Sequence, residues 1–515
     1  MSTREIVRRL RAHQAGAPLP STASRPFPIP ADPDILVVSF VRMGGESRPW
    51  GIAWGHPGAE PETAAIPEPR NRDAAADLAA RFAPALLEHL RCPGYADDAP
   101  MEAGDIDRVR QVWLPNATHL DMLHHLAFAY AGTRIDRPDR ELLRAFGRAC
   151  GWLFREGQRP GQLHVVVATA ALRDLWTFPA EDVRQGHLGF LLAWLTGGGE
   201  GAGDAEARRA AALLAEQTPV ATSLDPTLER DVLAPLLDQY RDGTAAAGDS
   251  IVERICDESG ARWRLTTDAL AVIRADPRPE NRGIAELTTH ALREQWWQYA
   301  RIEHGQPDDA DGPAFTPGVE TDRHPAAAGS RFHTYVASAE LVEHLLVHDD
   351  EELQADAVAA GDAAIGEILR LWDEGEGRRS RPVWVIRDDA DHQLRWRPGA
   401  DVAVIGAGWR TGTVRRIEET DDGRVEVEVA ILAGLRGKAS EAAPHDLAAG
   451  DPDLIGCRVG VVSKGAPSLT RDKAMYIWKG DGPGAWLTHG APSADPRSAV
   501  VDDIDDVAEL AEVDR

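Results

Sequence analysis

The chain has 515 residues, and a typical domain needs roughly 100–200, so we expect two to four domains rather than one small module. Hydrophobic residues make up 43% of the chain and charged residues 27%, which is ordinary for a globular protein and argues against pervasive disorder. The 56 basic and 83 acidic residues give a formal net charge of −27, which argues against a general nucleic-acid coat, because such binding requires excess Lys and Arg.

The first 30 residues predict a short basic amphipathic segment followed by a Pro-rich tether. Four arginines lie within the first 11 residues, and five prolines between Pro18 and Pro30 forbid a long helix there. This region has no continuous apolar run of the kind that a secretory signal needs. Elsewhere the apolar stretches are far shorter than the roughly 20 residues that cross a bilayer, so no membrane partner is expected.

The cysteines indicate a reducing compartment. Four are scattered along the chain without any Cys-x-x-Cys pair, which disfavours a disulfide scaffold and a structural zinc site. We therefore expect reduced thiols in a cytoplasmic protein. No cofactor is expected. These cysteines are Cys92, Cys150, Cys256 and Cys457.

Residues 31–196 predict a mixed, mainly helical domain that opens with a β-hairpin. Ile35–Val41 is β-branched and apolar, and a Gly-Gly turn follows it. Residues 50–54 then resume an extended pattern, so the two runs are expected to pair as a hairpin.

The rest of this domain reads as helices. An Ala-rich helix is expected to end near His89, with Asn71 or Asp73 as its N-cap. Further helices are expected over residues 114–195. Periodicity alone leaves residues 162–172 open between a short strand and a buried helix.

The middle of the chain predicts helical regions separated by linkers. The Gly-rich residues 197–203 form a flexible linker by composition, and a helical domain is expected over 204–305. Residues 306–330 are rich in Pro, Gly, Asp and Ala and predict a second linker. An acidic helical segment is then expected over 331–375.

After residue 375 the pattern changes to short strands. We expect a β-barrel domain over 376–490 and an acidic tail over 491–515. The whole chain is therefore predicted to be an α+β multidomain protein, mainly helical in its N-terminal and middle regions, with a C-terminal small β-barrel. The expected strands of the barrel are Val383–Ile386, Val402–Ile405, Gly412–Ile417, Arg424–Leu432 and Arg458–Val462.

One of these strands ends in Gly406-Ala407-Gly408 and looks like a dinucleotide-binding fingerprint. That chemistry requires a helix next, whose N-terminus holds the pyrophosphate. The third glycine position holds Thr411 instead, and the following residues alternate, turn at Asp422-Gly423 and alternate again. A strand, a turn and a strand leave no room for a crossover helix, so no Rossmann site is expected.

The same stretch resembles the KOW motif of small SH3-like barrels. The resemblance spans residues 399–432 and rests on Gly399–Val404, the glycines at 406, 408 and 412, and Thr413–Ile417. It implies a binding module for RNA, DNA or a protein partner. The alternative is a barrel that only packs on the chain's own helical domains.

Basic and aromatic residues gather late in the barrel region. Residues 460–486 interleave basic side chains with aromatic ones, a pattern that suits phosphate contact with base stacking. The alternative is a solvated edge strand guarded by lysines, with its aromatics turned inward. The candidate binding residues are Trp409, Arg410, Arg415, Arg416, Lys464, Arg471, Lys473, Trp478 and Lys479.

Two further clusters are candidate sites. Asp121 and His125 are four residues apart and share a helix face, but a catalytic zinc generally needs three protein ligands, so no metal is predicted there. Asp182, Arg184 and His187 form a charged loop between apolar runs, which is either a structural ion-pair network or the rim of a catalytic pocket.

The sequence favours a non-enzymatic adaptor or accessory subunit of an intracellular complex. It holds no P-loop, no Gly-x-Ser-x-Gly and no His-Glu-x-x-His. The expected partners are proteins of a larger complex, with nucleic acid as a second candidate ligand of the barrel. Two alternatives stay open: an enzyme with a pocket around Asp182, Arg184 and His187, and a pure protein–protein scaffold.

Overall fold

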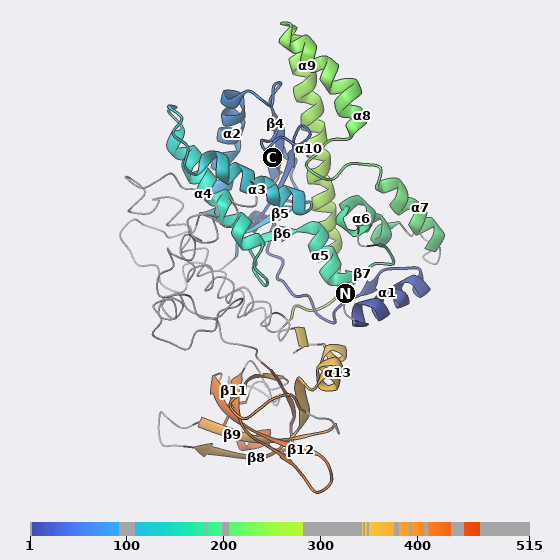
Figure 1. Cartoon of the computed structure of the whole chain (residues 1–515), viewed down its shortest axis with the longest axis vertical. Helices are drawn as coiled ribbons and strands as arrows, with labels where there is room; N and C mark the ends of the chain where they lie inside the picture. The colour runs from blue at the N-terminus through green and yellow to red at the C-terminus, as the bar shows by residue number, and fades with distance from the viewer. Residues whose placement is uncertain are drawn as a thin grey trace, which may run out of the picture. The chain divides into compact units, whose positions relative to one another are not determined.

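The computed structural model has a mixed α+β fold, with an α/β unit in the N-terminal half of the chain and a closed β-barrel in the C-terminal part (Figure 1). The residues that the structure describes are 3–91, 109–181, 183–197, 205–281, 342, 346–347, 350–374, 381–390, 394–405, 410–433 and 447–463.

A five-stranded sheet forms the centre of the α/β unit, in the order β4-β3-β2-β5-β6. β2 pairs antiparallel with β3 and parallel with β5, and all seven of its residues are buried, as expected of a central strand. The strands are β2 (Ile35–Val41), β3 (Gly51–Gly55), β4 (Glu62–Ala65), β5 (Gln111–Leu114) and β6 (Val165–Val167).

Helices cover both faces of this sheet (Figure 1). Alternate side chains of β2 point to opposite faces, so Leu36 and Phe40 join one core while Ile35 and Val37 join the other. The first core is closed by α2 (Arg72–Leu90), α3 (Ala117–Tyr130) and α4 (Arg140–Gly157). The second is closed by α5 (Ala168–Leu175), α6 (Leu188–Thr196) and α10 (Ala245–Arg274).

Local signals account for several of these elements. Asn71 is the N-cap of α2, and its side chain accepts hydrogen bonds from the backbone of Asp73 and Ala74. Residues 162–172, which periodicity left open, contain both alternatives, because the short strand β6 leads directly into α5.

The remaining elements of this part are α1 (Thr3–Ala15), β1 (Leu19–Pro20), η1 (Asp32–Asp34), β7 (Trp176–Thr177), η2 (Arg184–Gly186), α7 (Ala205–Ala215), α8 (Pro226–Leu228), η3 (Glu229–Leu233) and α9 (Ala234–Arg241).

Two expectations about the N-terminal half are wrong. The Pro-rich tether is docked in part, since β1 pairs with β7 and the backbone of Arg25 donates a hydrogen bond to Pro279. The separate helical domain over 204–305 is not separate, because α10 packs along β2 and β3. Both misreadings concern contacts between segments distant in sequence, which local patterns do not report.

The C-terminal barrel closes with six antiparallel strands in the order β10-β11-β12-β9-β8-β13. The five strands expected from the sequence are confirmed within the described residues. Register pairs Asp401 of β10 with Thr413 of β11, so the strand before the Gly-x-Gly is followed by an antiparallel strand, as predicted. The strands are β8 (Ala363–Glu374), β9 (Arg381–Asp388), β10 (Asp401–Ile405), β11 (Thr411–Glu419), β12 (Val425–Ala433) and β13 (Arg458–Ser463), with η7 at Pro452–Leu454.

The helix expected over 331–375 is wrong from residue 363 onward, because β8 begins there and the barrel starts earlier than residue 376. The helix that precedes it, α13 (Glu351–Ala360), ends at Gly361, whose φ of 76° is the left-handed conformation that glycine adopts at helix ends. Ala357 and Val358 of α13 pack against the barrel strands. Low strand propensity at the start of β8 is overridden by its pairing with β9 and β13.

Gly366 of β8 is essential for this pairing. A Cβ at this position would overlap the backbone carbonyl oxygen of Arg387 on β9. We therefore expect Gly366→Ala to lower the free energy of unfolding by about 1–3 kcal/mol or more, with a lower melting temperature by circular dichroism. Gly45→Ala is the matched control, since no atom lies near a Cβ there. Equal melting temperatures for the two variants would contradict this role of Gly366.

Candidate functional site

In open α/β sheets, ligands bind outside the carboxyl ends of the strands, at the point where the strand order reverses. In this sheet the reversal lies between β2 and β5, because the chain leaves β2 toward β3 on one side and returns to β5 on the other. The carboxyl ends of β2 and β5 are therefore where a sheet of this kind would hold a ligand.

A segment of the chain's own backbone lies at this place. We call Val220–Ser223 the strap. The backbone N–H of Arg42, the residue after β2, donates to the carbonyl of Thr222 at 2.7 Å. The N–H of Thr222 donates to the hydroxyl of Thr118, at the start of α3, at 3.0 Å. The backbone of Thr222 therefore hydrogen-bonds to the residue that follows β2 and to the first turn of α3, which follows β5.

Arg262 of α10 binds the strap, and its side chain is completely buried. Its guanidinium donates to the carbonyls of Ala221 at 2.8 Å and Ser223 at 3.2 Å. The same group forms an ion pair with Glu258 at 2.9 Å. Burial lowers the pKa of Arg262, and the Glu258 carboxylate opposes that shift, so the cation is held by a charge and by strap carbonyls.

His119 of α3 also binds the strap and joins it to β2. Its Nδ1 accepts the backbone N–H of Phe40 at 3.0 Å, so its Nε2 carries the proton and donates to the carbonyl of Val220 at 2.9 Å. Burial lowers the pKa of His119 to about 3, and the imidazole is neutral at neutral pH. Both ring nitrogens are used for structure, which makes His119 a positioning residue.

The predicted metal candidates lie near this place but make no ligand set. Asp121 is exposed and His125 is half-buried. Burial and then the positive charge of Arg42 lower the pKa of His125, and the same charge disfavours a metal cation there. Within the described residues, no group of three His, Cys, Asp or Glu side chains is placed to hold a metal ion.

The loop with Asp182, Arg184 and His187 is only partly described, because Asp182 lies outside the described residues. His187 is the N-cap of α6: its Nδ1 accepts the N–H of Phe190 at 3.1 Å, and its Nε2 donates to the carbonyl of Thr218 at 2.8 Å. Arg184 lies 3.5 Å from the Glu216 carboxylate. His187 therefore has a structural role, with no ring nitrogen left to act as a base in this arrangement.

The barrel's candidate arginines are engaged within the protein. Arg410 is buried, lies over the ring of Trp384 at 5.4 Å from its centroid, and donates to the carbonyl of Leu447. Arg415 pairs with Glu374, and Arg416 pairs with Glu418. Trp409, Lys464, Arg471, Lys473, Trp478 and Lys479 lie outside the described residues.

Sequence reasoning missed two exposed apolar side chains on the outside of the barrel, Trp372 of β8 and Leu432 of β12, which we call the apolar patch. Their exposed fractions are 40% and 41%. Register aligns Trp372 with Val383 of β9 and Val383 with Ala430 of β12, so these residues lie on the face opposite the barrel core. Val383 and Ala430 are buried there, whereas Trp372 stays partly exposed. Leu432 lies two residues beyond Ala430 and shares that face as well. Alternation along Arg424–Leu432 was the available signal for Leu432, whereas Trp372 lies in a segment that was expected to be helical.

No family model, curated protein or solved structure matches this chain. Among the described helices, none is both long and apolar enough to cross a membrane. The chemistry of the residues themselves is therefore what points to a function.

Removal of the Arg262 guanidinium should release the strap. We expect Arg262→Met to lower the free energy of unfolding by about 3–5 kcal/mol, because Glu258 and the strap carbonyls lose their buried donor. Urea unfolding measures the change. Arg264→Met, at an exposed position on the same helix, should cost less than about 0.5 kcal/mol, and a similar loss in both variants would contradict the strap's dependence on Arg262.

His119 should make the protein less stable in mild acid. Its pKa is about 3 when folded and 6.5 ordinarily, so the unfolded chain alone takes up this proton as pH falls from 6.5 toward 3. Stability should therefore fall by about 1.4 kcal/mol per pH unit in this range. We expect the stability gap between wild type and His119→Gln to shrink by about 2 kcal/mol from pH 7 to pH 5 in urea unfolding.

Phe128→Ser, at an exposed position of α3 without a titratable group, supplies the control for this measurement. Its stability difference from the wild type should be the same at pH 7 and pH 5. A gap between wild type and His119→Gln that stays constant from pH 7 to pH 5 would contradict the buried, neutral imidazole.

Proposed function

We propose that this protein is a non-enzymatic adaptor or accessory subunit of an intracellular complex, and that its C-terminal barrel contacts a protein partner. The apolar patch carries the proposal. Trp372 and Leu432 leave about two-fifths of their surface exposed on strands whose other face is the closed barrel core. Large aromatic and aliphatic side chains of this kind form the anchors of protein interfaces.

The charges around the patch favour a protein over a phosphate backbone. Arg370 and Arg387 both pair with the carboxylate of Glu426, at 3.0 and 2.8 Å. Of the candidate arginines, Arg415 and Arg416 each pair with a neighbouring acid, and Arg410 is buried on the Leu447 carbonyl. Phosphate contact requires cations that release counterions on binding, and cations already paired contribute little to it.

The α/β unit supports a non-catalytic role. Its reversal point between β2 and β5 is filled by the strap, and His119 and His187 use both ring nitrogens to hold backbone groups. Groups with these bonds stabilise the fold and are not poised for proton transfer.

Nucleic acid remains the second candidate ligand. The resemblance to KOW-type SH3-like barrels over residues 399–432 supports it, as do the basic and aromatic residues over 460–486. In that case full-length protein binds a single-stranded oligonucleotide with salt-sensitive affinity, and Lys473→Ala with Lys479→Ala weakens the binding. Fluorescence anisotropy at two salt concentrations measures it, and affinity unchanged by that double variant removes these lysines from the interface.

The protein-contact proposal is tested by recovery of the tagged full chain from its native host. We expect a stoichiometric protein partner with the wild type and its loss with Trp372→Ser and Leu432→Ser combined, because both apolar anchors are removed. Phe128→Ser is the matched control, since Phe128 is 67% exposed on α3 and lies outside the patch.

Circular dichroism establishes that each variant is folded before its partners are compared. A wild-type chain recovered alone and monomeric would contradict the adaptor proposal. Equal partner recovery from the patch variant and the wild type would remove the patch from the interface.

A further inference from the structure

We infer that a cavity between α1, α6 and α7 binds a small zwitterion with an aromatic side chain, such as a free aromatic amino acid. The cavity has a volume of about 460 Å³, within the range of roughly 300–1,000 Å³ that small-molecule sites occupy. It lies in the α/β unit and goes beyond the adaptor function proposed for the barrel.

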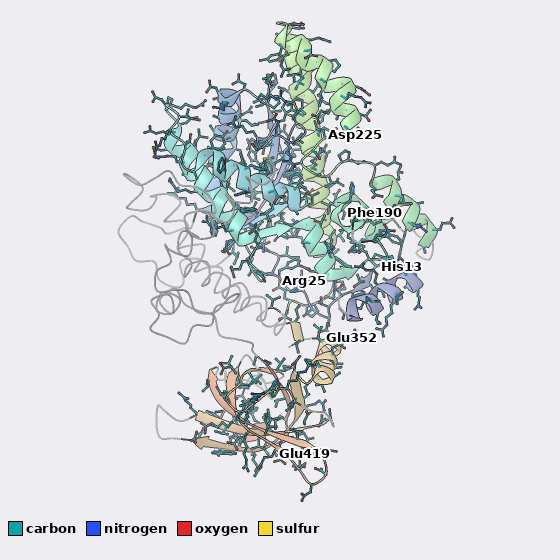
Figure 2. The ribbon with its side chains drawn as sticks, viewed as in Figure 1. His13, Arg25, Phe190, Asp225, Glu352 and Glu419 are labelled. Carbon is teal, nitrogen blue, oxygen red and sulfur yellow. The ribbon has the colours of Figure 1, made fainter. Side chains whose placement is uncertain are left out.

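Four separate elements supply its walls. His13 comes from the end of α1, Glu181 and Arg184 from the segment around η2, Phe190 and Trp194 from α6, and Arg209 from α7. Figure 2 labels His13 and Phe190 on two of these elements. A site assembled from several elements in this way is fixed by the fold and not by one flexible loop.

The floor of the cavity is aromatic. Phe190 and Trp194 are one helical turn apart on α6, with ring centroids 6.4 Å apart and planes at 68°. Both line the cavity, although only 2% and 4% of their surfaces are exposed. Edge-to-face or offset contact between aromatic rings is favourable beyond the burial of their area, which favours a ligand with an aromatic side chain.

An unused hydrogen-bond donor lies in this floor. The indole N–H of Trp194 is buried, and no described residue accepts a hydrogen bond from it. Buried donors are usually paired, and an unpaired one carries a desolvation cost that a ligand acceptor recovers. A carboxylate or amide oxygen of the bound molecule is then the acceptor.

Among the charged side chains that line the cavity, two of opposite sign form no ion pair with the described residues. Arg184 is engaged with Glu216 at 3.5 Å. In contrast, the carboxylate of Glu181 and the guanidinium of Arg209 form no ion pair within the described part of the chain, and both are exposed. Glu181 suits an ammonium group and Arg209 suits a carboxylate, since charged hydrogen bonds are stronger than neutral ones.

These features together select a zwitterion. An aromatic anion without an ammonium group would meet the unpaired carboxylate of Glu181, and an aromatic cation without a carboxylate would meet the unpaired guanidinium of Arg209. Only a ligand with both charges satisfies both groups while its ring lies on Phe190 and Trp194. Like charges brought together in this way cost binding energy, which is a source of specificity.

Three matched probes test the inference by isothermal titration of the full-length protein. L-phenylalanine carries both charges, N-acetyl-L-phenylalanine carries only the carboxylate, and L-phenylalanine amide carries only the ammonium group. We expect phenylalanine to bind about tenfold more tightly than either analogue, because each analogue loses one charged contact.

Charge variants assign each contact. With Glu181→Gln, N-acetyl-phenylalanine should bind as well as phenylalanine does. With Arg209→Gln, the amide should bind as well as phenylalanine. Trp194→Phe keeps the ring and removes the N–H, so it should weaken all three probes alike. Glu253→Gln and Arg264→Gln, at exposed positions of α10 outside the cavity lining, are the matched controls and should change nothing.

Different results of these titrations overturn the inference itself and its assignment to this cavity. Equal affinity for the three probes, a preference for either singly charged analogue, or no binding to any of them overturns the inference. Loss of probe selectivity in the α10 controls overturns the assignment to this cavity. None of these results bears on the barrel, so a failure here and a failure of the adaptor proposal are distinguishable.

Discussion

The contact between the Arg262 guanidinium and the strap is the interaction on which the α/β unit depends most. It places a full charge with no exposed surface on the face of the sheet that α10 covers. An isolated buried charge is very costly, and the cost is offset here by the Glu258 carboxylate and by carbonyl oxygens of the strap. The strap cannot leave without stranding this cation, so α10, the strap and the sheet form one cooperative assembly.

His119 also fixes the strap, because its ring hydrogen-bonds to the central strand β2 as well as to the strap. Its ring joins the backbone of β2 to the strap, so the central strand, α3 and α10 are linked through four residues of otherwise irregular chain. A place that serves as a ligand crevice in many open α/β sheets is used here as a structural joint. The side chains of His119 and Arg262, which both have catalytic potential, are thereby committed to holding peptide groups.

The sequence predicted the features that are encoded locally. The cap at Asn71 and the antiparallel strands on either side of the Asp422-Gly423 turn follow from short patterns, and the structure confirms both. The strand β5 was not predicted, and β6 was left open between a strand and a helix, because four and three residues are too few to show a period. The strap contacts of Arg262 join residues about 40 apart and leave no local signal. The cavity between α1, α6 and α7 likewise arises from separate segments, and of the predicted pocket residues only Arg184 lines it within the described part.

The position of α10 in the chain has a consequence for synthesis. This helix supplies Trp263, Leu270 and Ile273 to the core on one face of the sheet, yet it spans Ala245–Arg274, well after the last strand of that sheet. When β6 has been synthesised, every strand of this sheet exists, and α5 and α6 follow directly, but the part of the face that Trp263, Leu270 and Ile273 cover stays open until α10 is made. Apolar surface that is left open in this way during synthesis is prone to aggregation.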